Sequence, residues 1–219
     1  MPLLQTTAYL SLLIQFITGA IDVWGLTIQV EERTNIFKQL LFLELMVQAI
    51  EFSFYVWLVQ NIKNKNITKY RYYDWFITTP TMLITLMVYL DVNRKENSIL
   101  EYIKNNFLLV ITILILNALM LFFGYLGEIG VLKEKIAVGL GFIPFALYYY
   151  ILYQKYIKDT NIPDETKKVY YYFLFIWGLY GIAALLPFEY KNSMYNVLDL
   201  FSKNFFGIFL VYIIYQNRK

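Results

Sequence analysis

An aspartate and a lysine stand four residues apart in the last apolar segment of the chain, as Asp199 and Lys203. In a helix this spacing brings both side chains to one face. A lysine in such a segment has two common roles. It forms a structural ion pair with a carboxylate, here Asp199, or it forms a Schiff base with an aldehyde, because desolvation favours the neutral, nucleophilic amine. The pair by itself leaves both roles open.

A second group of chemically active residues lies in the sequence RYYDWFITTP, residues 71–80. Arg71, Asp74 and Thr78 are spaced i, i+3, i+7 and therefore form one stripe on a helix. Asp74 supplies a second carboxylate for a central cation, and Arg71 can balance two carboxylates that share that cation. Pro80 interrupts the backbone hydrogen bonds, and we expect Thr78 and Thr79 to bond the freed carbonyl oxygens.

Polar side chains also recur at helical spacing in three apolar segments. They are Thr7, Ser11, Gln15, Thr18 and Asp22 in the first, Glu44, Gln48, Glu51 and Tyr55 in the second, and Asn196, Asp199 and Lys203 in the last, with Asn204 about 100° further round the helix. A polar stripe cannot face lipid, so the three stripes must face each other or water. Hydrogen bonds between helices explain the amides and hydroxyls well.

The carboxyl groups of Asp22, Glu44 and Glu51 are explained less well by such bonds, because Lys and Arg partners are lacking there. A chain of acidic and amide groups is what a hydrated cation route needs. Glu44 and Glu51 are two helical turns apart, so they do not form a calcium site on their own. The stripes therefore favour an ion pathway, and no metal site is predicted.

The composition indicates which elements hold these residues. The chain has 219 residues, of which 59% are hydrophobic and 16% charged, whereas soluble domains have about 25% charged residues. This argues against a cytosolic enzyme, a nucleic-acid-binding protein and a disordered protein. The net charge of +3 is too small to indicate an anionic polymer as partner. The absence of Cys and His excludes disulfides, Cys/His metal sites, thiol nucleophiles and Ser-His-Asp triads.

The chain contains seven stretches long enough to cross a bilayer, for which about 20 mostly apolar residues suffice. They are Leu4–Val30, Phe37–Val59, Tyr72–Leu90, Ile99–Gly124, Val131–Tyr156, Val169–Pro187 and Met194–Gln216. Short polar segments connect them. The sequence thus predicts an all-α membrane protein, with residues 1–219 forming a single seven-transmembrane-helix bundle in the lipid bilayer.

The placement of Lys and Arg predicts the orientation, because cytoplasmic loops carry an excess of these residues. The excess falls inside when the N-terminus is outside and the C-terminus cytoplasmic. The loop with Lys63, Lys65 and Lys69 is the exception. We expect a multi-pass integral protein of the plasma membrane or another cellular membrane of a host.

The RYYDWFITTP run and Asp199-x-x-x-Lys203, in this order in a chain with seven predicted spans, resemble the microbial (type 1) rhodopsins over the whole chain. The resemblance implies all-trans retinal, bound covalently to Lys203 as a protonated Schiff base with Asp74 and Asp199 as counterions. It also implies a retinal pocket that contains Trp75, Thr78, Thr79, Met82, Met120, Gly124, Pro144, Tyr148, Trp177 and Tyr180.

Two positions depart from the family pattern. The proline of the sixth helix is Gly181 here, and an aromatic residue expected near the retinal ring is Ala184. These departures bear on the colour of absorption and leave the attachment unaffected. For any single aromatic residue, ordinary helix packing is the alternative in a chain with 21 Tyr and 18 Phe.

Within the family, Glu51 in the segment Ile50–Tyr55 falls where channelrhodopsins carry their central-gate glutamate. Ser11 and Asn204 look like the other two gate members. The short chain is most similar to the virus-encoded channelrhodopsins (group 1 viral rhodopsins). This resemblance implies a light-gated channel for monovalent cations that is sensitive to calcium, rather than an enzyme. The predicted ion pathway contains Ser11, Asp22, Glu44, Glu51, Arg71, Asn196 and Asn204.

Two other functions remain open at this stage. In a light-driven outward proton pump Asp74 is the acceptor, but the donor position is Thr85. Threonine carries no proton near neutral pH, so such a pump is expected to turn over slowly. A photosensory receptor is the weaker alternative, because no signalling domain is fused to the chain. The predicted partners are lipid and monovalent cations or protons, without nucleic acid, and a homo-oligomer is compatible with the sequence.

Overall fold

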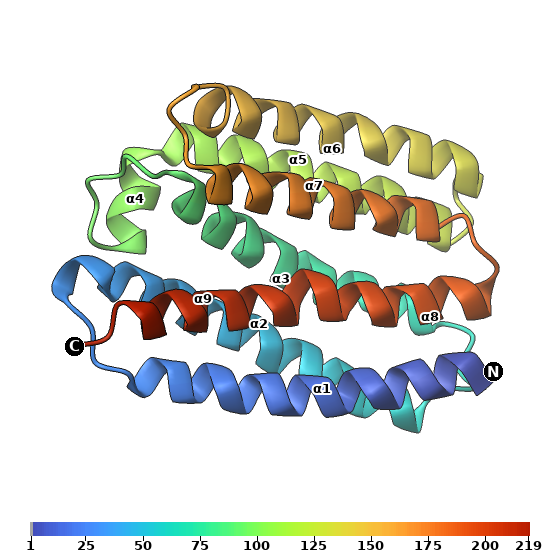
Figure 1. Cartoon of the computed structure of the whole chain (residues 1–219). Coiled ribbons are helices and arrows are strands. Elements are labelled where there is room, and N and C mark those ends of the chain that lie inside the picture. Colours follow the sequence, from blue (N-terminus) through green and yellow to red (C-terminus); the bar gives the residue numbers. More distant parts are fainter. Residues whose placement is uncertain (1) are drawn as a thin grey trace.

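The long helices of the protein lie side by side in one bundle (Figure 1). In this computed structural model we describe residues 2–219, and of Arg33 only the backbone. The helices are α1 (Pro2–Thr27), η1 (Glu32–Thr34), α2 (Asn35–Gln60), α3 (Ile67–Leu90), α4 (Ile99–Asn105), α5 (Phe107–Glu128), α6 (Glu134–Tyr156), α7 (Asp164–Ala183), α8 (Phe188–Asp199), η2 (Leu200–Asn204) and α9 (Phe205–Gln216).

The predicted fourth span is wrong in its first part. Ile99–Gly124 was expected to be one helix, but α4 ends at Asn105 and α5 begins at Phe107. Asn106 lies between them with φ −112° and ψ 26°, outside the helical region. Asparagine bonds readily to nearby backbone groups, which favours such a break, and its side chain donates to the carbonyl of Tyr102.

Three other spans begin five or six residues before the predicted residue. The helix α3 begins at Ile67 rather than Tyr72, and α7 begins at Asp164 rather than Val169. The helix α8 begins at Phe188 rather than Met194. Their first turns are polar, so hydropathy detects only the part of each helix that follows. In addition, α7 ends at Ala183, and Pro187 directly precedes α8.

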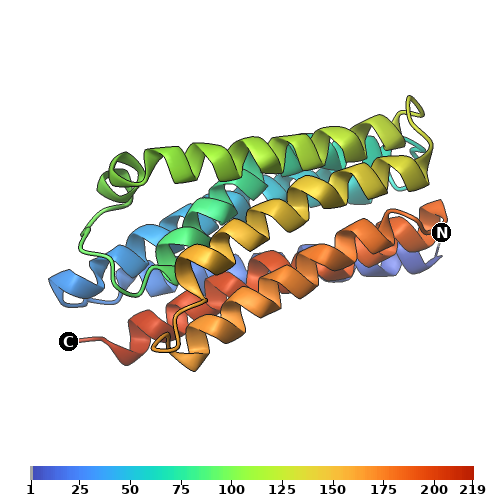
Figure 2. The same ribbon diagram turned by 90° about the horizontal axis from the view of Figure 1, so that it is seen from above.

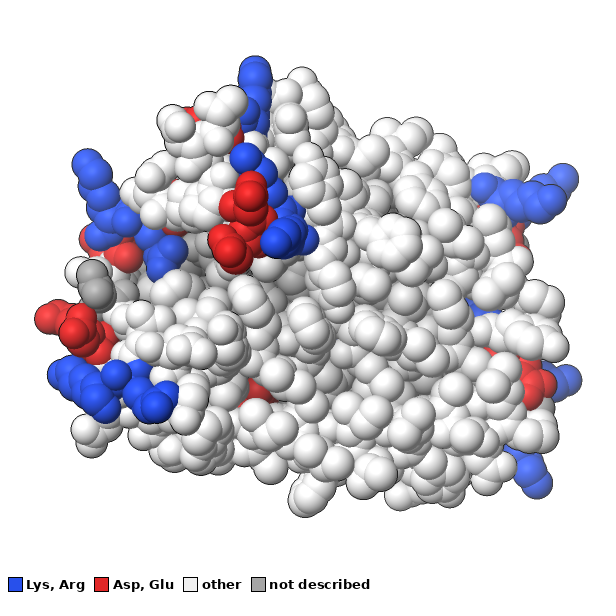
Figure 3. All heavy atoms as spheres, viewed as in Figure 1, with Lys and Arg blue, Asp and Glu red and all other residues white. Residues whose placement is uncertain are grey.

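The helices have the dimensions of membrane spans. By length and composition five of them are apolar enough to cross a bilayer, namely α1, α2, α5, α6 and the continuous rod α8–η2–α9. The remaining long helices, α3 and α7, lie among these five in the bundle. On the face shown in Figure 3, charged side chains gather toward the two ends and leave the surface between them almost free of charge.

The two termini lie at opposite ends of the bundle (Figures 1 and 2). This placement agrees with an odd number of crossings. We refer to the two ends as the N-terminal end and the C-terminal end. That the C-terminal end faces the cytoplasm stays a prediction from Lys and Arg placement.

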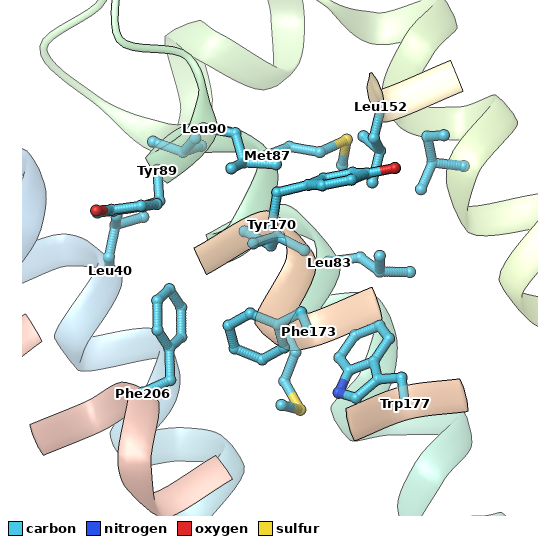
Figure 4. Packing of buried hydrophobic residues seen from close by; sticks show 14 of the residues in the cluster. Leu40, Leu83, Met87, Tyr89, Leu90, Leu152, Tyr170, Phe173, Trp177 and Phe206 are labelled. Atoms are coloured by element: carbon cyan, nitrogen blue, oxygen red, sulfur yellow. The ribbon is translucent and has the colours of Figure 1, made fainter. Parts of the chain in front are cut away.

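A dense apolar layer fills the bundle toward the C-terminal end. Figure 4 shows side chains from α2, α3, α6, α7 and α9 meeting there, among them Leu40, Leu83, Phe173 and Phe206. The rings of Phe173 and Phe206 pack edge to face at 4.9 Å, a favourable aromatic geometry. This layer separates the middle of the bundle from its C-terminal end.

Lys203 lies in a widened turn of the last rod. Residues Leu200–Asn204 form a π-helical stretch between α8 and α9, in which the backbone N–H of Phe205 bonds to the carbonyl of Leu200. Single π-helical turns inside α-helices are frequent at functional sites. The widened turn sets the rotation of Lys203 relative to Asp199.

Candidate functional site

Three carboxyl groups surround the ammonium group of Lys203. Its Nζ atom lies 3.0 Å from Oδ2 of Asp74, 3.3 Å from Oε1 of Glu51 and 3.6 Å from Oδ1 of Asp199. All four side chains are buried. Asp74 and Asp199 are the predicted counterions, whereas Glu51 was expected only in the ion pathway.

Arg71 forms a second cationic centre, which lies closer to the N-terminal end of the bundle than Lys203. One of its guanidinium nitrogens lies 3.1 Å from Oδ2 of Asp199, and it also donates hydrogen bonds to the side chains of Asn192 and Asn196. Asp199 is thus held between Lys203 and Arg71. Two buried cations face three carboxyl groups, so the acidic groups outnumber the cations that balance them.

Two tyrosines fix the orientation of Asp199. Tyr55 donates to its Oδ2 at 2.8 Å, and Tyr180 donates to its Oδ1 at 2.7 Å. The hydroxyl of Tyr180 also lies 2.7 Å from that of Ser202. Hydrogen bonds to a charged group are stronger than neutral ones, so Asp199 is rigidly placed. By contrast, Oδ1 of Asp74 has no hydrogen-bond partner among the described residues.

The threonines of the RYYDWFITTP run bond to their own helix. Thr78 donates to the carbonyl of Asp74 at 3.0 Å, and Thr79 donates to that of Trp75 at 2.8 Å. The carbonyl that Pro80 leaves without a donor belongs to Phe76, four residues before it. Neither hydroxyl bonds to it, so the expected role of the threonines at this carbonyl is wrong.

A cavity adjoins Lys203 between α3, α5, α6, α7 and α8, and its empty volume, including the open space at its mouth, is about 800 Å³. Of the predicted pocket residues, the walls contain Trp75, Thr79, Met82, Met120, Gly124, Trp177 and Tyr180.

Other wall residues were not in the predicted set. They are Tyr72, Leu121, Ala137, Val138, Gly141, Phe142, Phe145, Gly181, Ala184, Tyr195 and Ser202. Gly181 and Ala184, which depart from the family pattern, therefore line the cavity. A Cβ atom on Gly181 would come within 2.6 Å of the ring of Phe142, so the glycine makes room for that ring.

Three predicted pocket residues lie outside the cavity wall, namely Thr78, Pro144 and Tyr148. Tyr148 lies behind Met120 and donates to its sulfur at 3.8 Å. Phe145 lines the cavity from the same helix. The sequence gives little indication that Phe145 rather than Tyr148 faces the cavity, because α6 is apolar around most of its circumference and its rotation depends on packing.

The cavity walls suit a long apolar ligand with one reactive end. They consist mainly of aromatic and aliphatic side chains, and the primary amine of Lys203 is the nucleophile among them. Beside it, the unpartnered Oδ1 of Asp74 can accept a hydrogen bond or a proton. These features fit retinal, whose polyene is apolar and whose aldehyde reacts with amines.

The polar stripes of α1, α2 and η2 meet at Thr18. Its hydroxyl oxygen accepts hydrogen bonds from Nδ2 of Asn204, at 2.5 Å, and from the amide of Gln48. Gln48 also donates to the backbone carbonyl of Gln15 at 2.7 Å. We call this set of bonds the Thr18 junction, because it joins three helices through buried polar groups.

The three predicted gate residues bond to different partners. Ser11 donates to the carbonyl of Asn196 at 3.0 Å, Glu51 faces Lys203, and Asn204 bonds to Thr18. Asn196 also donates to Thr7 and so joins α8 to α1. The three residues therefore do not bond to one another, and Asn204 is the one that takes part in the Thr18 junction.

Asp22 and Glu44 lie beyond this junction toward the C-terminal end. Both are buried, and the carboxyl oxygens of Asp22 have no hydrogen-bond partner among the described residues. A Cβ atom on Gly207 would come within 2.6 Å of Asp22, so the glycine makes room for this carboxyl group. One turn further, Gly25 packs against Leu41 and Val211, so the polar stripe ends at an apolar layer.

The chain is similar to a known protein family along nearly its whole length. Residues 3–217 match the family described as bacteriorhodopsin-like protein. The crystal structure of viral rhodopsin OLPVRII is similar with a TM-score of 0.83 and 30% sequence identity, covering 98% of each chain. No curated protein matches the sequence.

More distant structures share the fold. Thermophilic rhodopsin from Rubrobacter xylanophilus has a TM-score of 0.76 at 16% identity, covering 95% of each chain. Xanthorhodopsin, a light-driven ion pump with dual chromophore, has a TM-score of 0.75 at 18% identity, covering 97% of this chain and 92% of its own. The family match over nearly the whole length confirms the resemblance found in the sequence, and the chain belongs to the bacteriorhodopsin-like family.

Proposed function

We propose that this protein is a light-gated channel for monovalent cations, with all-trans retinal bound to Lys203 as a protonated Schiff base. The observation that carries this proposal is the position of Glu51. Its carboxyl group lies 3.3 Å from Lys203, and it shares a face of α2 with Gln48 and Glu44. The group that would carry the chromophore is therefore in direct contact with the buried polar stripe.

Attachment of retinal requires a nucleophilic amine and a place for the resulting charge. Lys203 would hold retinal covalently through its side-chain nitrogen, which would carry a positive charge when protonated. Retinal, once bound, supplies light absorption and isomerisation. Asp74, Glu51 and Asp199 surround the nitrogen and stabilise its positive charge.

The same residues connect the site to the pathway. Asp74 has the shortest distance to Nζ of Lys203 and an unpartnered Oδ1, so it is suited to accept the Schiff-base proton. Loss of the positive charge at position 203 would remove the ion pair that holds Glu51 there. Asn204 directly follows Lys203 and bonds to Thr18, so movement of the π-helical turn would pull on the Thr18 junction.

Three closures lie along the proposed route. The first is the Arg71 network with Asn192, Asn196 and Asp199. The second is the Thr18 junction, and the third is the apolar layer at Leu41 and Val211. Between the second and third closures, Asp22 and Glu44 supply buried acidic groups that can attract cations.

Calcium sensitivity is not included in this proposal. Among residues 2–219, no three Asp, Glu, His or Cys side chains are placed to hold a metal ion. We therefore restrict the proposal to monovalent cations. We also propose that residues 1–219 form one domain in a host membrane, with the N-terminal end outside.

A slow outward proton pump is the second candidate. Its support is the placement of Asp74 as a proton acceptor beside Lys203. Thr85, at the donor position, donates to the carbonyl of Thr81 within its own helix and offers no titratable group. A photosensory receptor has no specific observation in its favour.

Voltage clamp under illumination separates these functions. Cells that express the protein with retinal are held at a series of voltages with different cation gradients. A channel gives a photocurrent that reverses sign with the gradient, whereas a pump gives outward current throughout. The control is Lys203→Ala at matched surface expression, which should give no photocurrent. A coloured protein without any photocurrent would contradict both transport functions.

A further inference from the structure

A hydrogen bond from α7 supports the widened turn that carries Lys203. The helix α7 lies beside the rod α8–η2–α9 (Figure 2), and the hydroxyl of Tyr172 donates to the backbone carbonyl of Phe201 at 2.7 Å. The ring of Tyr172 also packs on that of Phe205, with centroids 5.3 Å apart. Tyr172 therefore contacts the π-helical turn both within it and at the residue that follows it.

The widened turn takes the usual backbone donor away from the carbonyl of Phe201. In an α-helix that donor would be the N–H of Phe205, four residues on, but here this N–H bonds to the carbonyl of Leu200. Phe201 is 49% exposed on the outside of the bundle, where the hydrocarbon of a bilayer offers no hydrogen bond to the backbone. The hydroxyl of Tyr172 thus supplies a donor that neither this N–H nor the lipid provides.

A second tyrosine of α7 holds the next residue of the turn. The hydroxyl of Tyr180 lies 2.7 Å from that of Ser202. Tyr172 and Tyr180 are eight positions apart in α7, which is about 12 Å along a helix axis, yet their hydroxyls reach consecutive residues of the rod. The two side chains therefore converge on the turn from opposite directions, directly before Lys203.

We infer that Tyr172 is a positioning residue for Lys203, which acts by fixing the π-helical turn in one register. Without its hydroxyl, the next backbone donor for the carbonyl of Phe201 is the N–H of Phe206, five residues on, the spacing of a π-helical bond. That bond would move the widened turn one residue along the rod and change the rotation of Lys203. The register that Tyr172 holds is the one in which the amine lies among its three carboxyl groups.

The consequence for light absorption, and this consequence alone, rests on the proposed function. An amine rotated away from its carboxyl groups would stabilise the positive charge of the bound chromophore less well in the ground state. Tyr172→Phe removes only the hydroxyl and keeps the ring, so it should shift the visible band to longer wavelength, although Tyr172 is not part of the cavity wall. The matched control is Tyr171→Phe, at the exposed neighbouring tyrosine, which should keep the band in place.

Solid-state NMR of the retinal-loaded protein tests the hydrogen bond itself. Phenylalanine labelled with ¹³C at the carbonyl and serine labelled with ¹⁵N together select Phe-Ser pairs, of which the sequence has two, Phe52–Ser53 and Phe201–Ser202. We expect Tyr172→Phe to move the carbonyl resonance of Phe201 upfield, because a hydrogen bond to it is lost, and to leave that of Phe52 unchanged. Tyr171→Phe should change neither resonance.

The backbone amide of Lys203 tests the positioning role without the use of light. Ser202–Lys203 is the one Ser-Lys pair in the sequence, so carbonyl-labelled serine with ¹⁵N-labelled lysine isolates this amide. Its resonance should shift in Tyr172→Phe and stay in place in Tyr171→Phe.

Two results would overturn the inference. An unchanged carbonyl resonance of Phe201 in Tyr172→Phe would refute the hydrogen bond. A shifted carbonyl combined with an unchanged Lys203 amide, or with an unchanged band in coloured protein, would refute the positioning role. Both NMR measurements can also be made on protein without retinal, so a native protein that stays colourless would refute the proposed function separately.

Discussion

The carboxyl group of Glu51 lies 3.3 Å from the ammonium group of Lys203, although the two residues are 152 positions apart in the sequence. Glu51 therefore belongs at once to the charged site and to the polar stripe of α2. A single side chain thus links the proposed chromophore attachment to the proposed ion route, and four of the following predictions concern residues of this site or route.

Replacement of Lys203 by alanine should abolish the visible absorption band, because the attaching amine is lost. The measurement is an absorption spectrum of purified protein with added retinal. Lys191→Ala, at the other buried lysine, which pairs with Glu128 and Glu134, should keep the band. Retinal already joined to a small alkyl amine should restore colour to Lys203→Ala if that variant is folded. A persistent band in Lys203→Ala with retinal alone would refute the attachment site.

Asp74→Asn should shift the absorption band to longer wavelength. In the ground state the positive charge is concentrated near the nitrogen, whereas in the excited state it has moved along the polyene. The carboxylate of Asp74 therefore stabilises the ground state more than the excited state, and its loss narrows the energy gap between them. Asp22→Asn is the control and should leave the band in place, because Asp22 has no ion pair with Lys203 among the described residues. If Asp74→Asn gives no shift, Asp199 is the dominant counterion. The absorption band of Glu51→Gln then shows whether the third carboxyl group, that of Glu51, is charged.

Tyr55→Phe should lower the stability of the pigment by about 1–3 kcal/mol, the usual effect of losing a buried hydrogen bond to a charged group. The hydroxyl donates to Asp199 at 2.8 Å and to Asn196 at 3.2 Å, and both acceptors remain buried without it. Thermal bleaching of the visible band measures the change. Tyr212→Phe, at an exposed tyrosine, should bleach like the native protein, and equal behaviour of the two variants would contradict the role of Tyr55.

Gly25→Ala and Gly139→Ala should change stability in opposite directions. A Cβ atom on Gly25 would come within 2.6 Å of Val211 and 2.9 Å of Leu41, and such overpacking costs about 1–3 kcal/mol. Gly139 has open space around it, so alanine there should gain up to about 1 kcal/mol from its higher helix propensity. Thermal denaturation of both variants provides the measurement. A gain in stability for Gly25→Ala would mean that the apolar side chains of Leu41 and Val211 around Gly25 are loosely packed.

Glu51→Ala should change the size or the cation selectivity of the photocurrent, because it removes an acidic group from the route. The absorption spectrum must be recorded for the same sample, since Glu51 also contacts Lys203. Glu165→Ala, at an exposed position of α7, is the control. Unchanged currents in Glu51→Ala would remove this residue from the ion pathway.

The sequence by itself determined the membrane class, the seven apolar segments and the charged residues within them. These properties are local, because hydropathy and helical spacing act over a few turns of one helix. For this reason the stripe of Arg71 and Asp74 and the pairing of Asp199 with Lys203 could be predicted. Segment ends were less accurate where the first turns are polar, as at Asp164, or where a residue such as Asn106 interrupts the helix.

Only the tertiary structure decided which helices bring their polar faces together, and at what height. The contact of Glu51 with Lys203, the meeting of Gln48 and Asn204 at Thr18, and the choice of Phe145 over Tyr148 for the cavity wall are of this kind. Each depends on the rotation and axial position of one helix relative to another. Those are set by the packing of side chains that are distant in sequence, including the π-helical turn at Lys203, and no local pattern encodes them.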